Sequence, residues 1–216
     1  MTTESGENLN HEDLAEQLKK LSADERRKLL EEVETDDKLP ILRWSSNPEA
    51  VKAAFKFVER KDTVTFEELR SYLQSEGHID AEEGSYNFGI VDTDDGAFFS
   101  TTGDRDPNTE ISLTDTGREF AAVFDENPGL RPIERTLLIG MQPYGSAFFY
   151  LSTLEAYRED GGLLREELQE ALVDEYEGSG KYYTGYYNSW FHKLGLVEKE
   201  KIGRKVKYQL ATPSGW

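Results

Sequence analysis

The clearest periodic pattern of apolar and polar positions lies near the end of the chain. Tyr187, Phe191 and Leu194 follow one another at helical spacing, so they would share one buried face of a helix. Gly195 comes next, and glycine is the residue that most often ends a helix in the left-handed conformation. Apolar residues at alternate positions then predict two strands with a turn at Gly203. The pattern therefore predicts a helix, a turn and a two-stranded hairpin.

Charge sets this stretch apart from the rest of the chain. The whole sequence carries a formal net charge of −18, but residues 181–216 hold seven lysines and arginines against two glutamates, a net charge of +5. A basic and aromatic segment on an acidic body predicts contact with a polyanion, and the plainer alternative is that its charges are only solvated. The residues predicted to contact nucleic acid lie on the polar helix face and the hairpin: Lys181, Tyr182, Tyr186, Ser189, Lys193, Lys201, Arg204, Lys205 and Lys207.

The sequence from Trp190 to Lys199, WFHKLGLVEK, is followed by a basic hairpin and by YQLATPSG. This stretch resembles the recognition helix, turn and wing of winged helix-turn-helix proteins. The resemblance covers about residues 145–216 and is specific to the fold rather than to one family. It implies that the third helix and the wing are the functional faces.

A similar plan precedes this one in the first half of the chain. Asn47 and Pro48 predict the start of a helix that runs to Arg60. Thr65 predicts the N-cap of a second helix, which Gly77 ends. A short third helix, two strands and a closing helix are expected next, at 81–90, 97–100, 110–113 and 116–124.

Two sequence echoes support an internal duplication. Phe66–Leu69 is similar to Arg165–Leu168, 99 residues later. Ile111–Thr114 is similar to Tyr208–Ala211, 97 residues later. Each pair has the same place in the expected order of elements, as a repeat should. We therefore predict an α+β fold, mainly α with small β-hairpins, made of two tandem winged-helix domains.

The expected organisation has three parts. They are a disordered tail and helical arm over 1–46, an acidic winged-helix-like domain over 47–127, and a basic winged-helix domain over 128–216. The leucine stripes of the arm fall short of a heptad repeat, so packing on its own domain is favoured over a dimer contact. The first domain has Asp104 and Asp106 in its wing with only Arg105. Phosphate would be repelled there, which favours packing, dimerisation or protein contact.

No pattern typical of catalysis or of a cofactor stands out. The chain has no cysteine, and His11, His78 and His192 lie in separate elements without metal-ligand spacing. Asp104–Asn108 begins a pattern like that of a calcium loop, but Thr109 stands where the sharp turn needs glycine. An acidic turn is the better interpretation. We predict neither an enzyme nor a bound metal or cofactor.

The composition also bears on location and environment. The uncharged stretch 136–154 could be considered as a membrane span, but Pro143 and Gly145 interrupt it, which predicts two helices around a turn. No secretory signal is recognisable near Met1, so we expect a cytoplasmic protein. The 43 acidic residues against 25 basic ones resemble the proteins of salt-in halophilic archaea. The rival explanation is an ordinary acidic protein that avoids nucleic acid.

Two functions remain open. In the first, the chain is a transcriptional regulator and homodimer that reads double-stranded DNA with the third helix of its second domain and contacts phosphates with the wing. In the second, it is an adapter with tandem winged helices in a chromosome-organising or defence complex, because tyrosine is also frequent at protein interfaces. The basic wing favours the regulator, since an adapter does not need it.

Overall fold

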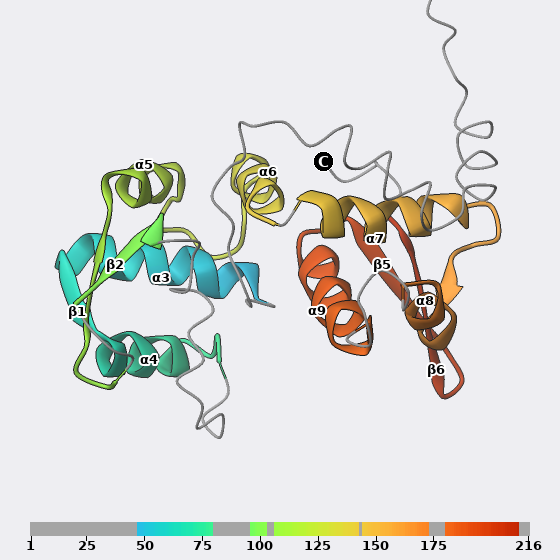
Figure 1. The fold of residues 1–216 in the computed structure, drawn as a ribbon, viewed down its shortest axis with the longest axis horizontal. Helices are drawn as coiled ribbons and strands as arrows, with labels where there is room; N and C mark the ends of the chain where they lie inside the picture. The colour runs from blue at the N-terminus through green and yellow to red at the C-terminus, as the bar shows by residue number, and fades with distance from the viewer. Residues whose placement is uncertain (1–46, 80–95, 103–105, 143, 173–179, 212–216) are drawn as a thin grey trace, which may run out of the picture. The chain divides into compact units, whose positions relative to one another are not determined.

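The computed structural model describes residues 47–79, 96–102, 106–142, 144–172 and 180–211 (Figure 1). These residues form helices and two three-stranded antiparallel sheets, in agreement with the predicted α+β class. They divide into two compact units: one holds the described residues up to 144 together with 189–194, and the other holds 145–188 and 195–211. The N-terminal arm, the third helix predicted over 81–90, and Asp104 and Arg105 of the acidic wing lie outside the described residues.

The first unit is built around helix α3 (Pro48–Lys61). Its other elements are β1 (Thr63–Thr65), α4 (Phe66–Ser75), β2 (Phe99–Thr101), β3 (Glu110–Leu113), α5 (Asp115–Val123) and α6 (Pro132–Gly140). Helix α3 packs against α4, α5, β1 and β3, and the strand order of the sheet is β1-β3-β2. The buried ring of Phe55 lies 4.8 Å from that of Phe99 and 5.5 Å from that of Phe124. The core therefore forms where α3 covers the sheet.

Local signals begin the helices of this unit where the sequence predicts them. Pro48 is the first residue of α3, a position whose backbone N–H has no partner within a helix. Thr65 caps α4, because its hydroxyl accepts a hydrogen bond from the amide of Glu68. The carboxylate of Glu68 accepts in return from the amide of Thr65, at 2.7 Å. This reciprocal pair satisfies two amides that the helix itself leaves unpaired.

The second unit contains the predicted hairpin and the first part of the predicted helix. Its elements are α7 (Tyr144–Ala156), β4 (Leu163–Leu164), α8 (Arg165–Leu172), β5 (Val197–Ile202), β6 (Lys205–Leu210) and α9 (Gly180–Lys193) up to residue 188, after which the helix belongs to the first unit. The strand order is β4-β6-β5, and α8 packs against β4 and β6. The uncharged stretch is split between α6 and α7, as the sequence predicts. Within the described residues, no helix is both long and apolar enough to cross a membrane.

The two units repeat one pattern of strand pairing. In the first unit Val64 pairs with Ile111, and in the second Leu163 pairs with Tyr208. The spacings between these equivalent residues are 99 and 97, the same as those of the sequence echoes. The helix start is repeated as well, since Glu167 accepts from the amide of Leu164 at 2.8 Å, as Glu68 does from that of Thr65. Each unit thus begins its second helix directly after an edge strand.

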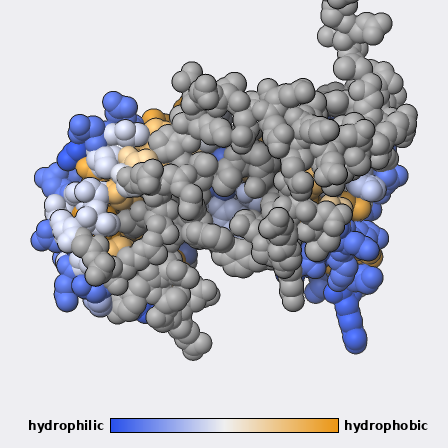
Figure 2. All heavy atoms as spheres, viewed as in Figure 1, coloured by the Kyte–Doolittle hydropathy of each residue, from blue (hydrophilic) through white to orange (hydrophobic). Residues whose placement is uncertain are grey.

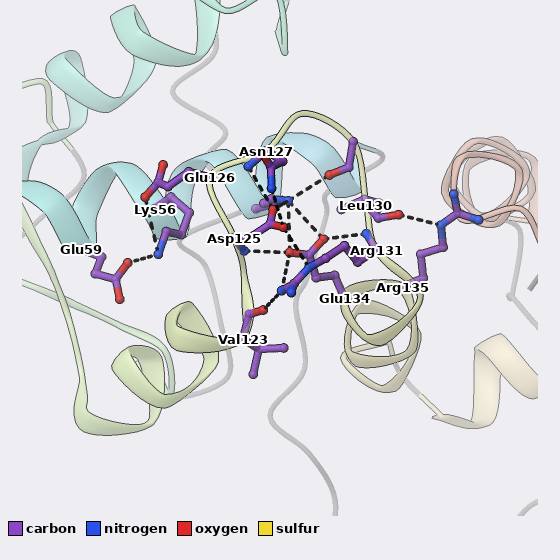
Figure 3. A network of polar contacts seen from close by, with 12 residues as sticks. Lys56, Glu59, Val123, Asp125, Glu126, Asn127, Leu130, Arg131, Glu134 and Arg135 are labelled. Atoms are coloured by element: carbon purple, nitrogen blue, oxygen red, sulfur yellow. Dashed lines mark hydrogen bonds and ion pairs between the residues drawn. The ribbon is translucent and has the colours of Figure 1, made fainter.

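A buried ion pair holds α6 to the rest of the first unit (Figure 3). The ammonium group of Lys52 in α3 lies 3.1 Å from the carboxylate of Glu134 in α6 and 2.8 Å from that of Asp125. It also donates to the carbonyl of Gly129 at 3.0 Å. The Glu134 side chain is fully buried, and it accepts from the amides of Arg131 and Asp125. The three protons of the ammonium group therefore all have acceptors.

These contacts shift the pKa of both carboxylates downward. Burial alone would raise the pKa of Glu134, but hydrogen bonds from the two backbone amides and from Lys52 outweigh burial and lower it. The hydrogen bond from Lys52, followed by those from Asn127, holds the pKa of Asp125 well below its usual range. A cut at residue 128, the predicted domain limit, would separate Lys52 from Glu134.

Candidate nucleic-acid interface

Helix α9 buries the apolar stripe that its sequence predicts. Tyr187, Phe191 and Leu194 are all at most 1% exposed, and Trp190 beside them is fully buried. Gly195 follows with a φ of 78°, the left-handed conformation expected at the end of the helix. The stripe is therefore core, and only the remaining positions of α9 can meet a ligand.

A buried hydrogen bond fixes α9 against α7. The hydroxyl of Tyr150 in α7 donates to the side-chain oxygen of Asn188 in α9, and both residues are buried. The rings of Tyr150 and Tyr187 are 5.5 Å apart. Burial raises the pKa of Tyr150 well above its ordinary value, and the nearby Tyr208 of β6 raises it further. Tyr150 thus remains a protonated donor and lies close to both α9 and β6.

The predicted contact residues of α9 differ in their exposure. Lys193 is exposed, as is His192 beside it. Tyr186 and Ser189 are only partly exposed. The backbone of Lys181 and Tyr182 belongs to α9, but the side chains of these two residues lie outside the described part of the structure. Among the described side chains of α9, the exposed ones therefore lie at its C-terminal end.

The hairpin of β5 and β6 is regular over its whole length. Its register pairs Val197 with Leu210 and Ile202 with Lys205, and Gly203 forms the turn with a φ of 63°. Residues from Glu198 to Lys205 are exposed, and Figure 2 shows hydrophilic residues gathered over this end of the hairpin. The turn end of the hairpin is therefore exposed, whereas Val197 and Tyr208 farther from the turn are buried.

The register sorts the side chains of this hairpin onto two faces, because opposite residues share a face and successive residues alternate. The face that includes the buried Val197 and Tyr208 is here called the inner face, and the other the outer face. The inner face carries Val197, Lys199, Lys201, Val206, Tyr208 and Leu210. The outer face carries Glu198, Glu200, Ile202, Lys205, Lys207 and Gln209. Arg204 lies at the tip between them.

Acidic and basic groups are mixed on the outer face. Glu200 lies directly opposite Lys207 in the register, and the carboxylate of Glu198 accepts from Gln209 at 3.1 Å. The ammonium group of Lys207 also donates to the carbonyl of Asp160 at 3.0 Å. An opposite-charge pair across two strands is stabilising in a sheet. The two lysines of this face are therefore balanced by the two glutamates of β5.

A groove of about 800 Å³ runs beside the outer face. Its lining includes Lys205, Lys207 and the half-exposed Ile202 from the hairpin, together with Glu167 and Glu170 from α8. None of the inner-face residues lines it. The lining of the groove thus agrees with the two faces assigned from the register.

The structure places the predicted basic residues of the hairpin on different sides. Lys201 is on the inner face, Arg204 is at the tip, and Lys205 and Lys207 are on the outer face. The sequence-based choice left out Lys199, which is exposed and precedes Lys201 on the inner face. A signal for it was present, since Lys199 stands two residues after the apolar Val197 and must share its face in a strand.

Neither a metal site nor a similar protein bears on this interface. Within the described residues, no group of three or more histidines, aspartates and glutamates could hold a metal ion. The carboxylate of Asp106 instead accepts from the amide of Asn108 at 2.7 Å, a contact typical of an acidic turn. No family model, curated protein or solved structure matches the chain.

Proposed function

We propose that the chain is a DNA-binding regulator made of tandem winged-helix domains, in which α9 is the recognition helix and the β5–β6 hairpin is the wing. The repeated order of a helix, an edge strand and a second helix, with a three-stranded sheet at the end, supports the winged-helix reading of both units. The described residues from 144 onward contain every element of that plan in chain order, with α9 as the third helix.

The observation that carries the proposal is the exposed basic hairpin of an acidic chain. Lys199, Lys201, Arg204 and Lys205 are all exposed on one hairpin, although the chain has a net charge of −18. The hairpin thus has an excess of positive charge despite its two glutamates, and DNA carries one phosphate charge about every 1.7 Å along its axis. A phosphate backbone is the partner that this surface matches best.

Helix α9 would supply the contacts to bases. Its buried stripe and the bond between Tyr150 and Asn188 hold the helix in a defined orientation. Tyr186 and Ser189 are partly exposed beside that stripe, and hydroxyl groups can donate to and accept from base edges. In this proposal, the wing contacts phosphates and positions the protein on the DNA, and the helix supplies the sequence preference.

An adapter function remains the second candidate, and one observation favours it. Ile133 of α6 is 58% exposed, which makes it the most exposed large apolar side chain of the described residues. A single exposed isoleucine is common on protein surfaces, so it supports a protein contact only weakly. We place such a contact in the first unit and DNA contact in the second.

The test is a titration of the full-length chain with DNA duplexes at several KCl concentrations, followed by fluorescence anisotropy. We expect the logarithm of the association constant to fall linearly with the logarithm of the KCl concentration. Arg204→Gln should weaken binding to all sequences alike, whereas Ser189→Ala should cost about 1–3 kcal/mol on the preferred sequence alone.

Arg165→Gln is the matched control, because Arg165 is also an exposed arginine of the second unit but lies at the start of α8. This variant should bind as the parent does. A folded parent that fails to bind any duplex, even in low salt, would reject the regulator and favour the adapter.

A further inference from the structure

We propose that only the inner face and the tip of the wing, through Lys199, Lys201 and Arg204, contact DNA phosphate, and that Lys205 and Lys207 do not. This inference rests on the proposed function and deepens it. It also changes the set of residues that the sequence predicts, because it adds Lys199 and removes the two outer-face lysines.

The first argument is the distribution of charge over the two faces. Both glutamates of the hairpin, Glu198 and Glu200, are on the outer face. The inner face has Lys199 and Lys201 and carries no acidic residue of the hairpin. A phosphate group that approaches the inner face therefore meets no carboxylate of the hairpin. On the outer face it would meet carboxylates within reach of each lysine.

The second argument is that the outer-face lysines already lie beside polar and acidic groups of the second unit. Lys207 lies opposite Glu200 and donates to the carbonyl of Asp160 at 3.0 Å. Lys205 shares the lining of the groove with Glu167 and Glu170 of α8. A phosphate bound there would have to approach these carboxylates, and the repulsion would oppose binding. The outer-face lysines therefore offset the negative charge of nearby carboxylates in the second unit.

Two double variants test the assignment with matched charge. K199Q/K201Q and K205Q/K207Q each remove two positive charges from the same hairpin, so they change the net charge of the chain equally. Each full-length variant is titrated with a short mixed-sequence DNA duplex over a KCl series. We expect K199Q/K201Q to weaken binding at least severalfold and to reduce the salt slope by about 1.8, about 0.9 for each lost phosphate contact. We expect K205Q/K207Q to keep the parental slope.

Two single variants provide a second test in case a double variant fails to fold, because Lys207 also donates a hydrogen bond to the carbonyl of Asp160. Lys201→Glu and Lys205→Glu reverse one charge each at exposed positions beside the turn. Thermal melting followed by circular dichroism checks that the two variants are folded. Lys201→Glu should lose far more DNA affinity than Lys205→Glu.

The outcomes separate this inference from the proposed function. If the parent binds DNA and the outer-face variants lose as much affinity and slope as the inner-face variants, the face assignment is wrong while DNA binding stands. If the outer-face variants lose more, the assignment is reversed. If the folded parent binds no duplex at any salt concentration, the proposed function fails and the face assignment fails with it.

Discussion

At the scale of single residues, the contact between Lys52 and Glu134 has the clearest energetic consequence. The two side chains are 9% and 0% exposed, and they are separated by 82 residues in the sequence. A buried ion pair adds little over a well-packed apolar pair, but removal of one partner leaves an uncompensated charge. The pair therefore matters most when it is broken.

We expect Lys52→Met to lower the free energy of unfolding by about 3–5 kcal/mol, because Glu134 would be left buried without its cation. Chemical denaturation of the full chain measures this loss. Lys61→Met is the matched control at an exposed position of the same helix, and it should stay within about 0.5 kcal/mol of the parent. The double variant Lys52→Met/Glu134→Leu should regain part of the loss. A single variant as stable as the parent would contradict the role of the pair.

The same pair predicts how stability changes in acid. The pKa values of Asp125 and Glu134 are lowered in the folded state, so their contribution is complete above the unfolded-state pKa of about 4. As the pH falls further, the unfolded state takes up protons first and the contribution is lost. Denaturation curves between about pH 5 and about pH 3 should show a larger loss for the parent than for Lys52→Met. Parallel losses would show that Lys52 does not lower the pKa values of these two carboxylates.

At the scale of elements, one buried hydroxyl group contributes to the orientation of α9. Tyr150→Phe keeps the ring but removes the donor to Asn188, which leaves a buried amide oxygen without that partner. We expect a loss of about 1–3 kcal/mol in the free energy of unfolding. A double-mutant cycle with Asn188→Ala separates the hydrogen bond from the effect of each residue alone. Additive losses in that cycle would mean that the two side chains do not act together.

The elements themselves differ in how far the sequence predicts them. The stripe of Tyr187, Phe191 and Leu194 and its end at Gly195 are confirmed, because a helix of this spacing can bury only one side. The capping box at Thr65 is equally local, since both of its partners lie within four residues. The order of strands in the two sheets needed the structure, because hydrogen bonding between β1 and β3 joins residues far apart in the chain.

At the scale of the whole molecule, the excess of acidic residues should make stability depend on salt. With a net charge of −18, self-repulsion favours the expanded state when screening is weak. We expect the midpoint of thermal unfolding to fall as KCl is lowered from molar to decimolar concentration. A variant with Glu119→Lys and Glu159→Lys, both at exposed positions, should show a weaker dependence because it carries less negative charge. A midpoint that does not change with salt would contradict the halophilic interpretation.

The sequence by itself determined the features that depend on near neighbours: the buried side of α9, the turn at Gly203, the cap at Thr65 and the excess of positive charge in the hairpin. Only the tertiary structure decided which face each lysine of the hairpin occupies and which carboxylate forms the buried ion pair with Lys52. The reason is physical. Helix spacing and turn conformation are set by a few adjacent residues, whereas strand register and buried ion pairs are set by side chains that only folding brings together.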